Sequence, residues 1–293
     1  MALYQANATE ELLRQAFPDC EIERVIIKTT GDKRTDVALN EVAKAEGNMD
    51  KGVFTKELEM ALDANEIDIA VHSLKDVPTV LAERFAIAAT LERAGVRDCL
   101  ITRHDGAWDD LPAGSRVGTS SVRRAKQLQW LRPDWEISNL RGNVPTRVKK
   151  LADGDDYDAI MLAEAGLARL GFLENPESPL HYHLLDEEIF YPAAGQGAIG
   201  LEIRVDDDAM RACCEAICHQ PTMICVTAER EFLRLLEGGC HTPVGVFSQL
   251  DGDALHMKAR VFPECGGEPQ IAEAHGPMAE PLLVAATLFK NLV

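Results

Sequence analysis

Apolar residues recur along the chain with two different spacings. Helical spacing predicts helices at 2–17, 54–62, 122–131, 144–151, 164–171, 207–236 (broken near 220–221) and 278–293. Short apolar runs predict strands at 21–28, 67–71, 85–89, 99–102, 116–119, 136–140, 156–163 and 198–204. Strands that alternate with helices favour parallel sheets, so the sequence predicts an α/β fold.

The end of the chain follows another pattern. Residues 244–261 alternate around Asp251-Gly252, which is typical of a hairpin, and an apolar-striped helix follows. This indicates a small α+β domain beyond two α/β units, a number of domains that a chain of 293 residues allows. We predict domain 1 at residues 1–91 and 198–217, domain 2 at 92–197 and domain 3 at 218–293.

Charge is distributed unevenly along the chain. The net charge is −18, yet residues 116–150 hold nine Lys and Arg against two acids, a local charge of +7. Such a reversal of sign indicates an anion site, although a solvated basic helix face is the plainer alternative. The acidic remainder argues against nucleic-acid binding, and no apolar run of about 18 residues predicts a membrane span. The start lacks a basic-then-apolar signal peptide, which favours the cytoplasm.

The basic residues gather where helices are predicted to begin. Ser121 is a helix cap before Arg123 and Arg124, and the turn 141–143 precedes a helix with Pro145 in its first turn. Positive charge at a helix start opposes the helix dipole and is costly without an anion. Two strand-to-helix turns of this kind can direct N–H groups and arginines at one crevice. Arg169 lies near a third such turn.

Lys75 and Asp76 directly follow the predicted strand at 67–71. In open α/β sheets, ligands bind outside the carboxyl ends of the strands, which is where these residues fall. A surface ion pair, worth at most about 1 kcal/mol, and simple turn chemistry before Val77-Pro78 are equally good interpretations. The residues alone leave the choice open.

Eight cysteines occur and none forms a Cys-x-x-Cys pair, so zinc and redox motifs are weak. Cys214, Cys218 and His219 could meet on a helix, but small apolar packing is the better interpretation than a metal. Cys240 follows two glycines on an uncrowded loop where its sulfur could be reached; most single cysteines are nevertheless inert.

Six motifs in one order resemble the porphobilinogen deaminase (hydroxymethylbilane synthase) family and together cover nearly the whole chain. They are Val71-His-Ser-Leu-Lys-Asp-Val-Pro78, Gly118-Thr-Ser-Ser-Val-Arg-Arg124, Leu140-Arg-Gly-Asn-Val144, Ala165-Gly-Leu-Ala-Arg-Leu-Gly171, Ala194-Gly-Gln-Gly-Ala198 and Leu236-Glu-Gly-Gly-Cys240.

The resemblance implies three domains, the first two similar to periplasmic binding proteins with a crevice between them. It implies a transferase of haem and tetrapyrrole biosynthesis that joins four porphobilinogen molecules head to tail, each losing ammonia, into hydroxymethylbilane. A dipyrromethane primer would be attached to Cys240 through a thioether. It further implies a cytoplasmic monomer with no nucleic-acid or membrane partner, whose product passes to uroporphyrinogen-III synthase, and no metal.

The resemblance also implies roles for individual residues. Asp76, assisted by Lys75, would interact with pyrrole nitrogens as the catalytic group. Cofactor contacts would come from Cys240, Lys75, Thr119, Ser121, Arg123, Arg124, Arg141, Gly142, Gln196 and Phe54. Substrate carboxylates would be held by Arg147, Arg169 and Arg141, because planar guanidinium groups suit carboxylates.

One feature of the family pattern differs. Family members open with a strand and a turn bearing Arg and Ser, whereas residues 1–5 match the helix that follows, so we expect the first sheet to lack a strand. A non-catalytic protein that binds a carboxylated small molecule is therefore the alternative to the enzyme.

Overall fold

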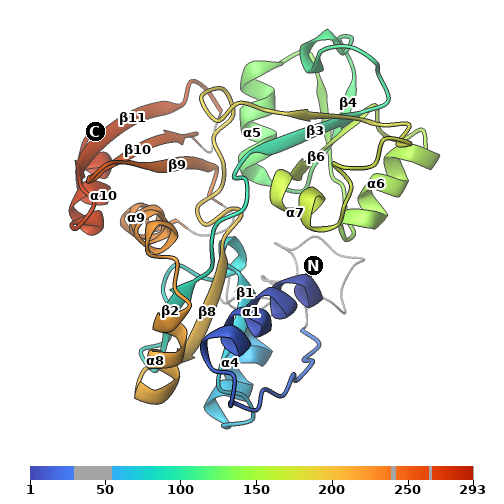
Figure 1. Ribbon diagram of the computed structural model, residues 1–293. Helices are drawn as coiled ribbons and strands as arrows, with labels where there is room; N and C mark the ends of the chain where they lie inside the picture. Colours follow the sequence, from blue (N-terminus) through green and yellow to red (C-terminus); the bar gives the residue numbers. More distant parts are fainter. Residues whose placement is uncertain (30–54, 239–241, 264–265, 293) are drawn as a thin grey trace.

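The computed structural model describes residues 1–29, 55–238, 242–263 and 266–292. Within these ranges the strands form three separate sheets, each with its own helices (Figure 1). No helix in the same ranges combines the length and the apolar character that crossing a membrane requires. The α/β character of the first two sheets with their helices, and the α+β character of the third, confirm the predicted fold class.

The first sheet is antiparallel, with β8 between β1 and β2. Helix α1 packs on β1, α4 contacts β1 and β8, and α8 lies against β2 and β8. Leu201, Ile203 and Cys214 are fully buried in its core. The elements are α1 (Ala2–Ala16), α4 (Lys56–Asp63), β1 (Ala70–Ser73), the short 3-10 helix η1 (Leu74–Asp76), β2 (Phe85–Thr90), β8 (Ile199–Arg204) and α8 (Asp208–Ala216).

The second sheet is mixed and has helices on both faces. Strand β4 runs parallel to β5 and β6, while β3 is antiparallel to β6 and β7. Along the fully buried β6, Met161 joins the cluster under α5, while Ile160 and Leu162 join the one under α6 and α7. In sheet order the strands are β5 (Glu136–Ser138), β4 (Arg116–Gly118), β6 (Ala159–Ala163), β3 (Asp98–Thr102) and β7 (His181–Leu184). The helices are η2 (Trp108–Asp110), α5 (Val122–Leu131), α6 (Val144–Asp153) and α7 (Glu164–Arg169).

The third sheet is an antiparallel meander with two helices on one face. Phe232, Leu255 and Leu288 are fully buried between the sheet and these helices. The elements are α9 (Gln220–Leu235), β9 (Val244–Asp251), β10 (Ala254–Val261), β11 (Gln270–Pro277) and α10 (Pro281–Lys290).

Two chain segments, 91–97 and 192–198, run between the first and second sheets (Figure 1). Helix α9 is fastened to both of them through Glu229, which is fully buried. The carboxylate of Glu229 accepts hydrogen bonds from Arg93 at 2.8 and 2.9 Å, from the Gly195 N–H at 2.7 Å and from the Ser248 hydroxyl at 2.6 Å. Because a buried charge is tolerated only when it is paired and hydrogen-bonded, this contact fixes the third sheet to the crossing segments.

Several local predictions are confirmed. The Ser121 hydroxyl accepts a hydrogen bond from the Arg124 N–H at 3.4 Å, and Asn143 Oδ1 accepts one from Thr146 N at 2.9 Å. The caps therefore start α5 and α6 where the sequence placed them. The hairpin between β9 and β10 also turns at Gly252, whose φ of +57° suits glycine.

Other predictions are wrong. Residues 21–28 form no strand, and Val25 and Ile26 are 49% and 73% exposed, since β-forming residues need a neighbouring strand to pair with. The first sheet is not parallel, because β1 and β2 both pair with β8 in the opposite direction. Two strands, β7 and β11, were not predicted; their sequences His-Tyr-His-Leu and Gln-Ile-Ala-Glu-Ala-His-Gly-Pro are too polar to stand out.

Candidate active site

The turn that carries Asp76 lies against the turn that carries Gln196. Asp76 ends η1, directly after β1. Gly195 has φ +69°, and a Cβ there would lie 3.2 Å from the Lys75 backbone nitrogen. A glycine thus lets the two turns touch, and it brings residues about 120 positions apart in sequence to one place.

Asp76 is surrounded by positive charge. Burial raises the pKa of Asp76, while the charges of Lys75, His72, Arg124 and Arg147 act in the opposite direction. Burial likewise lowers the pKa of Lys75, against the attraction of Asp76. The carboxylate therefore pays a desolvation cost that a cation placed beside it would reduce.

Arg123 and Arg124, at the start of α5, meet on one carboxylate. Asp98, the first residue of β3, is fully buried and binds Arg123 Nη1 at 2.6 Å and Arg124 Nε at 2.8 Å. Burial opposes ionisation of Asp98, but the attraction and hydrogen bonds of the two arginines outweigh it and lower its pKa to about 2. Two guanidinium charges against one carboxylate leave this buried network with an excess of positive charge.

Gln196 completes the same network. Its side-chain amide donates to Asp98 Oδ1 at 3.1 Å and to the Val96 carbonyl at 2.7 Å, and its Oε1 accepts from Arg123 Nη2 at 3.4 Å. With 1% of its surface exposed, Gln196 connects the two crossing segments to the arginines. Its predicted contact with the cofactor stays a prediction.

Arg147 and Arg141 add charge from α6 and the turn before it. Arg147 donates from Nε to the Gly142 carbonyl at 2.7 Å, and its Nη2 lies 3.4 Å from the Ser120 hydroxyl. Burial and then the nearby charges of Arg124 and Arg141 lower the pKa of Arg147 to about 10. Burial and the like charges of Arg124 and Arg141 both disfavour the charged guanidinium, and a bound anion would favour it.

Gly142 shapes the turn that presents Arg141. Its φ is +118°, and a Cβ there would lie 2.8 Å from Thr146 Cγ2. Both facts favour glycine at this position. The predicted contact of Gly142 with the cofactor is thus compatible with the backbone, and it stays a prediction.

Arg169 ends α7 and points to the second crossing segment. Its Nη2 donates to the Gly197 carbonyl at 2.7 Å, and its guanidinium lies 5.8 Å from the centre of the Tyr4 ring. Burial lowers its pKa. Arg169 thus spans from the second sheet to α1 of the first.

Thr119 and Ser121 use their hydroxyls in the strand-to-helix turn. The Thr119 hydroxyl accepts from the Ser121 N–H at 3.2 Å, and Ser121 caps α5. Two of the predicted cofactor residues, Cys240 and Phe54, lie outside the described residues.

Several residues of the site were missed from the sequence. Asp98, Arg93 and Glu229 connect elements far apart in the chain. The local sequence around a single charged residue does not show which distant residue it will contact. His72 was quoted only as part of a motif; its Nε2 lies 2.8 Å from Glu202 Oε2, both side chains being buried. The helical group at Cys214 is confirmed as packing: Cys214 and Cys218 join an apolar cluster, and His219 caps α9. Among the described residues no group of three ligating side chains could hold a metal.

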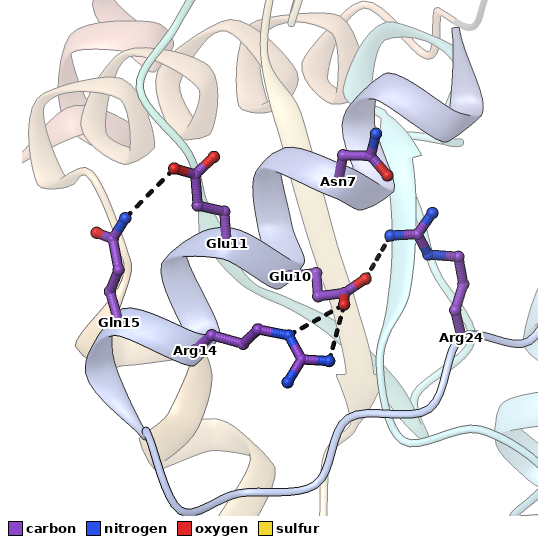
Figure 2. A pocket seen from close by; sticks show the side chains of 6 residues that line it. All are labelled: Asn7, Glu10, Glu11, Arg14, Gln15 and Arg24. Carbon is purple, nitrogen blue, oxygen red and sulfur yellow. Dashed lines mark hydrogen bonds and ion pairs between the residues drawn. The ribbon is translucent and has the colours of Figure 1, made fainter.

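A surface hollow of about 430 Å³ lies elsewhere, on α1 (Figure 2). Glu10 bridges Arg14, at 2.9 Å, and Arg24 there. None of the predicted site residues lines this hollow, whose residues are Asn7, Glu10, Glu11, Arg14, Gln15 and Arg24. Exposed ion pairs of this kind contribute little and indicate no ligand.

Comparison with known proteins gives a consistent result. The family model for "Porphobilinogen deaminase, dipyromethane cofactor binding domain" matches residues 1–212, and that for the C-terminal domain matches 223–292. A porphobilinogen deaminase of Chlorobium luteolum is 44% identical over 261 residues, 89% of this chain and 80% of the relative. One of Syntrophobacter fumaroxidans is 44% identical over 280 residues, 96% and 87% of the two chains.

Among solved structures, an arginine-specific periplasmic binding protein of Salmonella typhimurium has a TM-score of 0.39 and 12% identity, covering 78% of this chain and 82% of that one. The sequence matches define the class: an enzyme that builds on a dipyrromethane group. The chain belongs to the porphobilinogen deaminase family.

The residues present suit a group with several carboxylates. Burial lowers the pKa of both Lys75 and Arg147, and at Asp98 two guanidinium groups share one carboxylate. Carboxylates placed among these groups would supply the missing negative charge.

Proposed function

We propose that this chain joins four porphobilinogen molecules head to tail, with loss of ammonia, into hydroxymethylbilane on a covalently bound dipyrromethane group. The observation that carries the proposal is the position of Asp76, which lies within the electrostatic reach of Lys75, Arg124 and Arg147. The substrate has the matching chemistry: each molecule brings two carboxylates and leaves a cation when ammonia departs. Family membership supports this enzyme over a non-catalytic binding protein.

The dipyrromethane group, attached to Cys240, supplies the pyrrole carbon to which the first substrate is joined. Its carboxylates would be held by Lys75, Thr119, Ser121, Arg123, Arg124, Arg141, Gly142 and Gln196, with Phe54 beside it. Arg147, Arg169 and Arg141 would hold the carboxylates of the incoming porphobilinogen. Fixed guanidinium forks orient these groups and so replace a bimolecular encounter with proximity.

Asp76 acts on the charge that develops in the substrate. When ammonia leaves the aminomethyl carbon, the remaining pyrrole is electron-poor. A carboxylate about 4 Å away, at an effective dielectric constant near 20, stabilises such a cation by about 4 kcal/mol, or roughly three decades of rate. Burial of Asp76 increases this effect because the site is partly screened from water. The positive charge of Lys75, next in sequence, opposes the rise in the pKa of Asp76 that burial causes.

The division into domains follows the same proposal. Residues 1–91 and 198–217 would form the domain of Asp76, 92–197 the arginine domain, and 218–293 the domain of Cys240. The crossing segments 91–97 and 192–198 then act as the hinge between the first two. We further infer a cytoplasmic monomer that passes its product to uroporphyrinogen-III synthase.

The test uses purified protein supplied with porphobilinogen. We expect ammonia release, and an intact mass that exceeds the chain mass by one dipyrromethane and returns to the chain mass in Cys240→Ser. Tight, reversible binding of porphobilinogen without ammonia release would contradict the enzyme and favour the binding protein. If the added mass persists in Cys240→Ser, Cys240 is not the attachment site, but the proposed enzyme activity is not contradicted.

A further inference from the structure

Arg230 connects helix α9 to the turn that carries Asp76. Its Nη1 donates to the Val77 carbonyl at 3.0 Å and its Nη2 donates to the Pro78 carbonyl at 2.6 Å. One residue further, the Thr79 hydroxyl donates to the Gly238 carbonyl at 3.4 Å. Two consecutive carbonyls held by one planar guanidinium fix the direction of the peptide that follows Asp76.

Apolar packing alone does not hold this segment. Val77 is 3% exposed and packs with Leu74 and Val226, which anchors its side chain. Beside it, however, lies a groove of about 290 Å³ whose lining includes Leu74, Thr79, Val226 and Arg230. On this open side, the two hydrogen bonds from the Arg230 guanidinium add a polar restraint on the backbone.

The position of Arg230 on α9 gives the contact its importance. The preceding residue, Glu229, fastens α9 to both crossing segments through Arg93 and Gly195. The helix ends at Leu235, five residues before Cys240 in the sequence. A single helix therefore holds the turn of Asp76 and the crossing segments, and it ends close in sequence to the predicted cofactor cysteine.

We propose that Arg230 is a positioning residue, which holds the Asp76 carboxylate in place relative to the second-sheet arginines and to α9. The inference rests on the proposed function and adds a residue that touches neither substrate nor cofactor. A displacement of about 1 Å in a reacting group can lower a rate by about a hundredfold, so a clamp on the Asp76 turn is expected to affect turnover.

The first test measures the clamp without activity. Amide hydrogen exchange is followed in the peptide covering residues 74–82 of the wild type, Arg230→Met and Arg234→Met. Arg234 is the matched control, since it lies one turn along α9, pairs with Glu231 of its own helix at 2.6 Å and is 50% exposed. We expect exchange about tenfold faster in Arg230→Met, equivalent to ~1.4 kcal/mol, and no change in Arg234→Met. Equal exchange in all three proteins would overturn the proposal.

The second test separates positioning from a general structural role. In Arg230→Met, kcat is expected to fall about 10- to 100-fold while KM stays within about twofold, because the substrate-binding arginines are untouched. Arg230→Lys keeps one donor and should recover part of kcat. A kcat for Arg230→Met within about twofold of that for Arg234→Met contradicts the positioning role but leaves the proposed function intact. A wild type that releases no ammonia contradicts the proposed function, and the positioning role with it.

Discussion

Two aspartates in this protein have opposite environments. Asp98, at the start of β3, is bound by Arg123, Arg124 and Gln196, and its pKa is lowered to about 2. Asp76, at the end of η1, is only partly buried, and desolvation raises its pKa against the opposing charges of Lys75, His72, Arg124 and Arg147. The protein stabilises the ionised form of Asp98, whereas it destabilises the ionised form of Asp76.

The difference separates structural from catalytic use of the same side chain. A carboxylate bound by two arginines makes its surroundings rigid, and its oxygens are already engaged in hydrogen bonds rather than available to a substrate. A desolvated carboxylate with incomplete pairing gains most when a cation forms beside it. We therefore propose that Asp98 belongs to the framework that holds the arginines, and that Asp76 acts in the reaction.

Replacing Asp98 should have the largest effect on stability. Asp98→Ala leaves two buried guanidinium groups without their carboxylate, so the free energy of unfolding is expected to fall by about 3–5 kcal/mol. Urea unfolding followed by circular dichroism measures this. Asp134→Ala is the control, since it breaks an exposed pair with Arg132 at 2.7 Å and should hardly move the unfolding midpoint. Equal losses in the two variants would show that burial of the network is unimportant.

The titration of Asp98 should also appear in the pH dependence of stability. The pKa of Asp98 falls from 3.8 to about 2 on folding, which corresponds to about 2 kcal/mol. A lowered pKa contributes stability that is fully present above about pH 4 and is lost as the pH falls towards 2. The stability difference between wild type and Asp98→Asn, measured by urea unfolding, should be constant from pH 7 to pH 5 and shrink below pH 4. A difference that does not shrink would mean that Asp98 titrates normally.

Removing Arg147 tests the crowding of positive charge. Arg147→Gln is expected to raise KM for porphobilinogen about tenfold, the loss of one charge-assisted contact. The ligand-free protein should lose no stability, because the pKa of Arg147 is lowered by burial and by Arg124 and Arg141. Lys149→Gln, exposed on the same helix, is the control and should leave KM unchanged. A normal KM in Arg147→Gln would remove this residue from the substrate site.

Replacing Asp76 should change stability with the opposite sign to replacing Asp98. Because its pKa is raised in the folded state, ionisation disfavours folding as the pH rises from the unfolded pKa through the folded pKa. Thermal unfolding should therefore show Asp76→Asn at least as stable as the wild type at pH 7, with the advantage vanishing at pH 4. A variant less stable than the wild type at pH 7 would place Asp76 in the structural class with Asp98.

Much of this site could be predicted because its signals are local. The cap at Ser121, the turn at 141–143, the cluster of basic residues and the position of Asp76 after a strand are each encoded within about ten residues of sequence. The elements around them were therefore found nearly to the residue, as with Val122–Leu131.

The rest depends on contacts between distant parts of the chain. Asp98 meets Gln196 and Glu229 meets Arg93 across about a hundred residues or more, and no periodicity encodes such pairs. The direction of β8 also depends on the crossing segments, so the antiparallel first sheet could not be seen from alternating strands and helices. Residues 21–28 have strand composition, but strand formation needs a partner that composition cannot supply.

The central claim is that Asp76 stabilises the cation formed within the arginine site. The most direct test is intact-mass analysis after a brief pulse of excess porphobilinogen, comparing wild type with Asp76→Asn, both carrying the primer. We predict that the wild type gains pyrrole units within the pulse, whereas Asp76→Asn adds them about a thousandfold more slowly and stays at the mass of the primed protein. Addition of pyrrole units to Asp76→Asn at the wild-type rate would contradict the account.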